Sequence, residues 1–129
     1  MHRGYLKTGA LLAALAVVLG AFGAHGLKPV LPPETMAAYQ TAVQYQMFHS
    51  LALLLTGFLF ERFGGRLLRW AANLFIGGIL FFSGSLYALA LLKATATVGL
   101  SGIGILTPVG GLLFIAGWGS LFAGLSKKN

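Results

Sequence analysis

The chain has 129 residues, of which 57% are hydrophobic and only 9% are Asp, Glu, Lys or Arg. A soluble domain carries roughly 25% charged residues, so this composition excludes an ordinary soluble enzyme domain, and the scarcity of polar stretches excludes a disordered chain. The net charge of +7 comes from nine basic and two acidic residues, and the basic residues form no stripe with aromatic residues, which excludes nucleic-acid binding. Cysteine is absent, which excludes disulfides and thiolate metal sites.

Four long uncharged stretches divide the chain. They are Thr8–Leu27, Thr35–Phe60, Trp70–Leu92 and Ala94–Ser126. A helix needs about 20 apolar residues to cross a bilayer, and backbone groups in lipid must bond internally. The sequence therefore predicts an all-α integral membrane protein, a four-helix up-down antiparallel bundle. A single transmembrane domain is expected over residues 1–129, with helices over approximately 5–27, 34–60, 67–92 and 103–125.

The first stretch also has a feature of a cleaved secretion signal. Residues 14–16 have the small-x-small form that follows a basic N-terminal region. That site lies in the middle of an apolar run that continues to Leu27, whereas the apolar region of a signal peptide has only about 7–15 residues. We therefore expect the N-terminal segment to be retained as the first span.

Proline, glycine and charge mark the connections between the spans. Residues 28–33 contain three prolines, which end the first helix, and Glu34 then suits the first turn of the second. A short polar turn over 61–66 separates the second and third helices. Thr107 followed by Pro108 is typical of a helix start. The fourth helix therefore begins near residue 103 or at Pro108, in which case residues 98–106 form an apolar loop.

Basic residues predict the orientation. Seven of them lie at the two termini and in the second connection, and two lie in the first and third connections. By the positive-inside rule, both termini of this multi-pass protein face the cytoplasm from the inner (plasma) membrane. Membrane lipids are the expected partners, together with a second copy of the chain or another membrane protein.

Small residues at helical spacing suggest faces for close helix packing. The candidates are Ala16, Gly20 and Ala24 in the first helix, Gly77 and Gly84 in the third, and Ala116, Ser120 and Gly124 in the fourth.

Polar residues within the spans are the candidates for function, because they are expensive in hydrocarbon. On the second helix, Tyr45 and Gln46 share a face with His49, and Gln40 begins a second polar row with Gln44. Both rows are expected to point inward or to line a small hydrated gap.

Three interpretations of the histidines compete. In the first, His25 and His49 hold a haem or a metal, but their depths differ by about 15 Å, so neither a cofactor nor a metal is expected. In the second, His49 titrates in a small channel or transporter for protons or small solutes, although no second ionisable group provides a relay. In the third, both histidines are hydrogen-bonding groups that fix helix packing. The third interpretation is favoured.

Enzymatic chemistry finds no support in the sequence. Glu34 and Glu61 lie at opposite membrane faces, and Ser50 has no acid or suitably placed base. No catalytic residues are predicted, and an enzyme is not expected.

Several unusual strings nevertheless identify a family resemblance. Residues 20–27 read GAFGAHGL, 41–53 read TAVQYQMFHSLAL, 82–87 read FSGSLY, and 107–111 read TPVGG, followed by GW at 117–118. Together they resemble the small membrane proteins of the domain of unknown function 423 family, which includes bacterial YgdD- and YwdK-type proteins. The resemblance covers essentially the whole chain and implies four transmembrane helices, but it implies no biochemical activity.

The resemblance also suggests that the polar residues act as a set, in one pocket in the outer half of the membrane. This pocket would contain His25, Gln40, Tyr45, Gln46, His49, Ser83, Ser85, Tyr87 and Thr107. A structural, assembly or lipid-interaction role is expected, with the small channel or transporter as the alternative.

Overall fold

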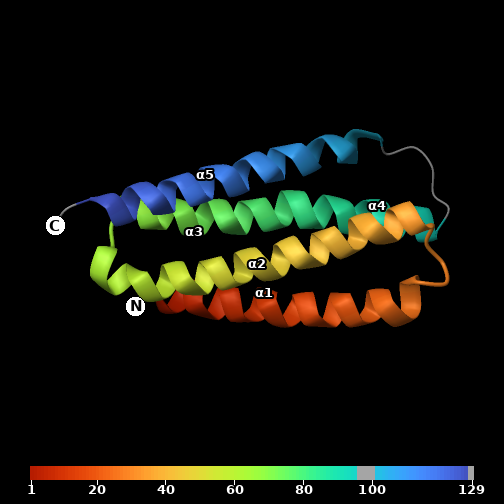
Figure 1. Ribbon diagram of the computed structural model, residues 1–129, viewed down its shortest axis with the longest axis horizontal. Helices are drawn as coiled ribbons and strands as arrows, with labels where there is room; N and C mark the ends of the chain where they lie inside the picture. Colours follow the sequence, from red (N-terminus) through yellow and green to blue (C-terminus); the bar gives the residue numbers. More distant parts are fainter. Residues whose placement is uncertain (96–100, 128–129) are drawn as a thin grey trace.

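A computed structural model describes residues 1–95 and 101–127, and four antiparallel helical spans account for most of them (Figure 1). The first span is α1 (Arg3–Phe22) with the π-helical segment Gly23–Leu27, and the second is α2 (Pro33–Phe63). The third is α3 (Arg66–Gly78), the π-helical segment Ile79–Ser83 and α4 (Gly84–Ala94), and the fourth is the 3₁₀ segment Ser101–Ile105 with α5 (Leu106–Ser126). All four are long and apolar enough to cross a membrane, which confirms the predicted fold class.

The spans form a flattened array in which neighbours in sequence are neighbours in space. α1 packs along α2, α2 packs on α3 and α4, and α5 packs on α3 and the π-helical segment that follows it (Figure 1). The N-terminus, the C-terminal end of α5 and the turn between α2 and α3 lie at one end, which we call the terminal end (Figure 1). The two middle spans are the most buried, and the first span is the most exposed.

The boundaries of the helices follow local chemistry. Pro33 opens α2 with Glu34 in its first turn, as expected. Between α2 and α3 the chain reverses at Gly65, whose φ of +99° is a conformation that glycine adopts readily. α5 begins at Leu106, so Thr107 lies inside the helix instead of capping it, and residues 98–100 of the expected loop lie outside the described residues.

α5 packs against the third span through three glycines that are seven residues apart. Each glycine faces a large residue of the third span, and these large residues are also seven residues apart. The three pairs, which we call the glycine ladder, are Gly110 with Phe82, Gly117 with Phe75 and Gly124 with Leu68. An added Cβ atom at the three glycines would lie 2.3, 2.8 and 2.5 Å from its nearest neighbour, so only glycine permits this approach.

The small-residue faces expected from the sequence coincide only in part with these contacts. Ala16 is buried, and an added Cβ atom on Gly20 would lie 3.3 Å from Val43, whereas Ala24 is exposed. On α5, Gly124 belongs to the ladder, but Ala116 is exposed and Ser120 is half-buried. The predicted α5 face is corrected, because Ala116 precedes Gly117 and points about 100° away from it.

On the third span, Gly77 and Gly84 make looser contacts than the ladder glycines do. An added Cβ atom on Gly77 would lie 3.5 Å from Leu113, which is an ordinary contact distance. One on Gly84 would approach only Ile79 of the same span, at 4.0 Å. Neither glycine is required for close helix approach.

Candidate functional site

Gln46 links three of the four spans by hydrogen bonds. Its buried amide donates from Nε2 to the carbonyl oxygen of Leu12 in α1 over 2.8 Å. Its Oε1 accepts a hydrogen bond from the hydroxyl of Tyr87 in α4 over 2.6 Å. Both ends of the amide are therefore satisfied inside the protein, where an unpaired amide would be costly.

Other polar side chains also bond across helices to backbone carbonyls. The hydroxyl of Tyr39 in α2 donates to the carbonyl of Leu19 in α1. Ser83, in the π-helical part of the third span, donates to the carbonyl of Ala42 in α2 over 2.7 Å. Among the described residues that are not exposed, no buried side-chain nitrogen or oxygen lacks a partner. The buried polar groups therefore form a bonded network.

His49 has both ring nitrogens engaged. Nδ1 lies 2.7 Å from the carbonyl oxygen of Tyr45, and Nε2 lies 3.1 Å from the indole Nε1 of Trp118 in α5. A carbonyl can only accept and an indole N–H can only donate, so these bonds assign a neutral imidazole with its proton on Nδ1. The ring also stacks on Phe114 at a centroid distance of 3.6 Å. A proton or a metal at Nε2 would have to displace Trp118.

Ser85 and Thr107 join α4 to α5. Their hydroxyl oxygens lie 2.6 Å apart, and Ser85 donates to the carbonyl of Phe82 over 2.9 Å. Because the Ser85 proton is used in that bond, Thr107 is the donor between the two hydroxyls. This interhelical bond replaces the capping role that the sequence predicts for Thr107.

The structure brings together only part of the predicted pocket. Gln46, His49, Ser83, Ser85, Tyr87 and Thr107 make the interhelical bonds described above. His25 lies exposed in the π-helical segment that ends the first span, away from these residues. In a correction to the single expected pocket, His25, His49 and Tyr87 do not share a cavity among the described residues, because His49 faces α5 while Tyr87 packs against Tyr39.

A groove of about 830 Å³ runs between α2 and α5, and we call it the α2–α5 groove. Its walls carry the aromatic side chains of Tyr45, Phe48, Phe82, Phe114 and Trp118, with His49 and Gly111 also lining it. The hydroxyl of Tyr45, a residue that is 38% exposed, has no hydrogen-bond partner among the described residues. The groove is thus mostly apolar, with an unsatisfied hydroxyl on its wall.

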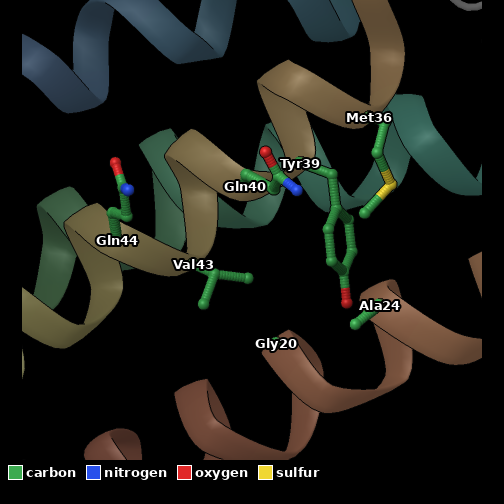
Figure 2. Close-up of a pocket in the computed structure, with 7 residues that line it drawn as sticks. All are labelled: Gly20, Ala24, Met36, Tyr39, Gln40, Val43 and Gln44. Carbon is green, nitrogen blue, oxygen red and sulfur yellow. The ribbon is translucent and has the colours of Figure 1, made fainter. Parts of the chain in front are cut away.

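A smaller cavity of about 200 Å³ lies between α1 and α2 (Figure 2). Figure 2 shows Tyr39 reaching from α2 toward Gly20 and Ala24 of the first span. Gln40 and Gln44 lie one turn apart on α2, are exposed and have no described hydrogen-bond partner. The second polar row, expected to point inward or to line a small hydrated gap, lines this cavity at the outer surface, and Gln40 does not join the interhelical bonds around Gln46.

Trp118 and Phe114 belong to the site although the sequence alone does not predict them there. The sequence carries a partial indication for Trp118, because this isolated tryptophan near the middle of the fourth span lies at the depth of His49. Among the described residues, no three His, Cys, Asp or Glu side chains come close enough to hold a metal ion.

Comparisons with known proteins identify a family and several related membrane proteins. Residues 19–111 match the family model described as "Protein of unknown function (DUF423)". The chain belongs to the DUF423 family. It is 45% identical over 114 residues to a UPF0382 membrane protein of Staphylococcus epidermidis, a match that covers 88% of each chain.

Matches to other DUF423 relatives cover similar lengths. The chain is 41% identical over 115 residues to the UPF0382 membrane protein YwdK of Bacillus subtilis, covering 88% of this chain and 89% of YwdK. It is 39% identical over 129 residues to a UPF0382 membrane protein of Haemophilus influenzae, covering 100% and 98% of the two chains. No solved structure matches the chain. The resemblance expected from the sequence is confirmed over most of the chain.

Proposed function

We propose that this DUF423 protein binds a membrane lipid in the α2–α5 groove. The observation that carries the proposal is the groove itself, whose volume of about 830 Å³ lies within the range of about 300–1,000 Å³ for small-molecule sites. Phe82 and Phe114 line it near the middle of their spans, at the depth of the hydrocarbon. An apolar chain is the ligand that suits such walls.

The hydroxyl of Tyr45 adds a polar requirement. The Tyr45 ring is fixed by stacking on Phe82 at a centroid distance of 4.7 Å, while its hydroxyl lacks a described partner. A hydroxyl in hydrocarbon without a hydrogen bond is unfavourable. A lipid oxygen that accepts this bond would remove the penalty, so we propose an amphiphile with an oxygen beside Tyr45 and its chain along the groove.

The network favours this role over proton or solute transport. In a transport mechanism His49 would have to take up and release protons, yet its Nε2 accepts a bond from Trp118 and its ring is stacked on Phe114. Each proton uptake at Nε2 would break the bond to α5. The bonding supports a fixed wall that shapes the groove.

Filling the groove tests lipid binding directly. A Cβ atom at Gly111 would lie 4.0 Å from Phe82, so Gly111→Leu fits the backbone and places its side chain in the groove. The lipid that remains bound after detergent exchange is measured by native mass spectrometry. We expect this variant to bind lipid about tenfold more weakly than the unaltered protein does.

The matched control is Gly119→Leu. Gly119 is an exposed glycine of the same helix, with nothing within 4 Å of an added Cβ atom, and it does not line the groove. This variant should retain lipid as the unaltered protein does. Equal retention by both variants would remove the groove as the binding site.

We further propose that the protein lies in the inner (plasma) membrane with the terminal end in the cytoplasm. Supporting this orientation, seven basic residues lie near the two termini or in the parts of α2 and α3 that flank their turn, and two lie elsewhere. Because the chain has no cysteine, one cysteine introduced at Lys28 or Lys127 is unique. A membrane-impermeant maleimide applied outside intact cells or spheroplasts should label Lys28→Cys but not Lys127→Cys, and the reverse pattern would invert the topology.

A further inference from the structure

A second cavity, of about 280 Å³, lies at the terminal end on α3 and is lined by Arg66, Arg69, Trp70 and Asn73. These residues follow the spacing i, i+3, i+4 and i+7, so they share one face over the first two turns of the helix. None of them lines the α2–α5 groove. We call this cavity the arginine cavity.

The side chains of the arginine cavity offer hydrogen-bond donors. Each guanidinium carries five N–H donors and no acceptor, and the Trp70 indole only donates. The Oδ1 of Asn73 already accepts from the hydroxyl of Tyr5 over 3.0 Å, which leaves the amide Nδ2 as its remaining polar group. A cavity with this inventory suits a ligand rich in acceptors.

Neither acidic side chain of the protein pairs with the two arginines. The chain has two acidic residues: Glu61 lies 3.7 Å from the N-terminal amine, and Glu34 lies in the first turn of α2, at the opposite end of the protein. Arg66 and Arg69 therefore have no carboxylate partner among the described residues. Within the described part of the chain, the cavity thus carries two positive charges that no carboxylate pairs with, and such charges favour an anion.

The position of the cavity favours an anion at the membrane surface. Trp70 is 54% exposed, and tryptophan is enriched where hydrocarbon meets headgroups. The guanidinium of Arg69 lies 6.0 Å from the Phe60 ring, a contact that holds it beside the apolar body of the bundle. The charges thus lie at the end of a span, where phospholipid phosphates are found.

We infer that the arginine cavity binds the phosphate group of an anionic phospholipid. A guanidinium can donate two parallel hydrogen bonds to one phosphate, and two guanidiniums one helical turn apart can hold the same group. The Asn73 amide and the Trp70 indole supply further donors. This site is separate from the groove and does not depend on lipid binding there.

The test compares two double variants of the full chain with equal loss of charge. Arg66→Gln/Arg69→Gln alters the cavity, whereas Arg3→Gln/Lys7→Gln removes two exposed charges from the first turns of α1 at the same end. Binding of phosphatidylglycerol, phosphatidylcholine and inorganic phosphate to the purified protein in detergent is measured by native mass spectrometry. Phosphatidylglycerol should bind about tenfold more weakly to the cavity variant than to the control variant.

Several outcomes overturn the inference. Equal losses in the two variants would show general attraction between charges, and equal binding of phosphatidylcholine would exclude selection for an anion. Saturation by inorganic phosphate at lower concentration than by phosphatidylglycerol would overturn the assignment to a lipid. Gly111→Leu should leave the preference for phosphatidylglycerol unchanged. A failure of lipid binding in the groove can therefore be distinguished from a failure of phosphate binding in the arginine cavity.

A charge-preserving variant guards against a folding defect. Arg66→Lys/Arg69→Lys keeps both charges but removes the planar fork that binds phosphate with two bonds. Its circular dichroism should match that of the unaltered protein, while it should still bind phosphatidylglycerol about fivefold more weakly. Unchanged binding would contradict recognition by the guanidinium groups.

Discussion

Replacing Gly110 with alanine is expected to lower the free energy of unfolding by about 3 kcal/mol, at the upper end of the usual cost of overpacking. The added Cβ atom would lie 2.3 Å from the backbone nitrogen of Phe82 and 2.7 Å from its Cα atom. A side chain could rotate away from such a contact, but a backbone cannot. α5 must therefore move away from the third span, which loosens the other two pairs of the glycine ladder.

Two further glycines of α5 provide graded controls for Gly110→Ala. At Gly117 the added Cβ atom would meet ring atoms of Phe75 at 2.8 Å, and at Gly119 it would meet nothing within 4 Å. Unfolding by dodecyl sulfate in mixed micelles, followed by tryptophan fluorescence, should show a smaller loss for Gly117→Ala. Gly119→Ala should show no loss, or a gain of up to about 1 kcal/mol from helix propensity. Equal effects at the three positions would contradict close packing through the ladder.

The spans could be predicted because their signal is local. Uncharged length sets the number of helices, and short connections set their antiparallel order. The glycine ladder could not be predicted from the sequence, because each close contact depends on which residues of two different helices face each other. Gly117 packs closely because Phe75 faces it on another span. Small residues four apart, such as Ala116 and Ser120, look equally suitable in sequence but face elsewhere.

For the polar residues, the sequence predicts how far along its helix each one lies, but it does not predict the direction in which its side chain points. Depth follows from the rise of about 1.5 Å per residue, and it correctly placed His49 and Gln46 deep within the second span. The direction in which a side chain points depends on how the helix is rotated by its neighbours, which one sequence does not specify. Gln40 therefore lies outside, and His25 is exposed where a π-helical segment ends the first span. The pairing of His49 with Trp118 needed the same missing information.

Replacing Gln46 with leucine is expected to lower the free energy of unfolding by about 2 kcal/mol. Leucine preserves much of the buried volume but removes the acceptor for Tyr87 and the donor for the Leu12 carbonyl. The Tyr87 hydroxyl then loses its partner inside the bundle, and this desolvated group accounts for most of the loss. The same mixed-micelle unfolding experiment measures the change.

A double-mutant cycle separates this bond from general packing. Tyr87→Phe alone leaves Gln46 Oε1 without its partner, whereas the double variant Gln46→Leu/Tyr87→Phe leaves neither group unpaired. The double variant should therefore lose less stability than the sum of the single variants, by about 1 kcal/mol. Thr107→Val, which removes a separate bond to Ser85, should combine with Gln46→Leu additively within about 0.5 kcal/mol. Additivity of the Gln46 and Tyr87 changes would show that this bond does not hold α2 to α4, and that the tie between the two middle spans comes from Ser83 and apolar packing instead.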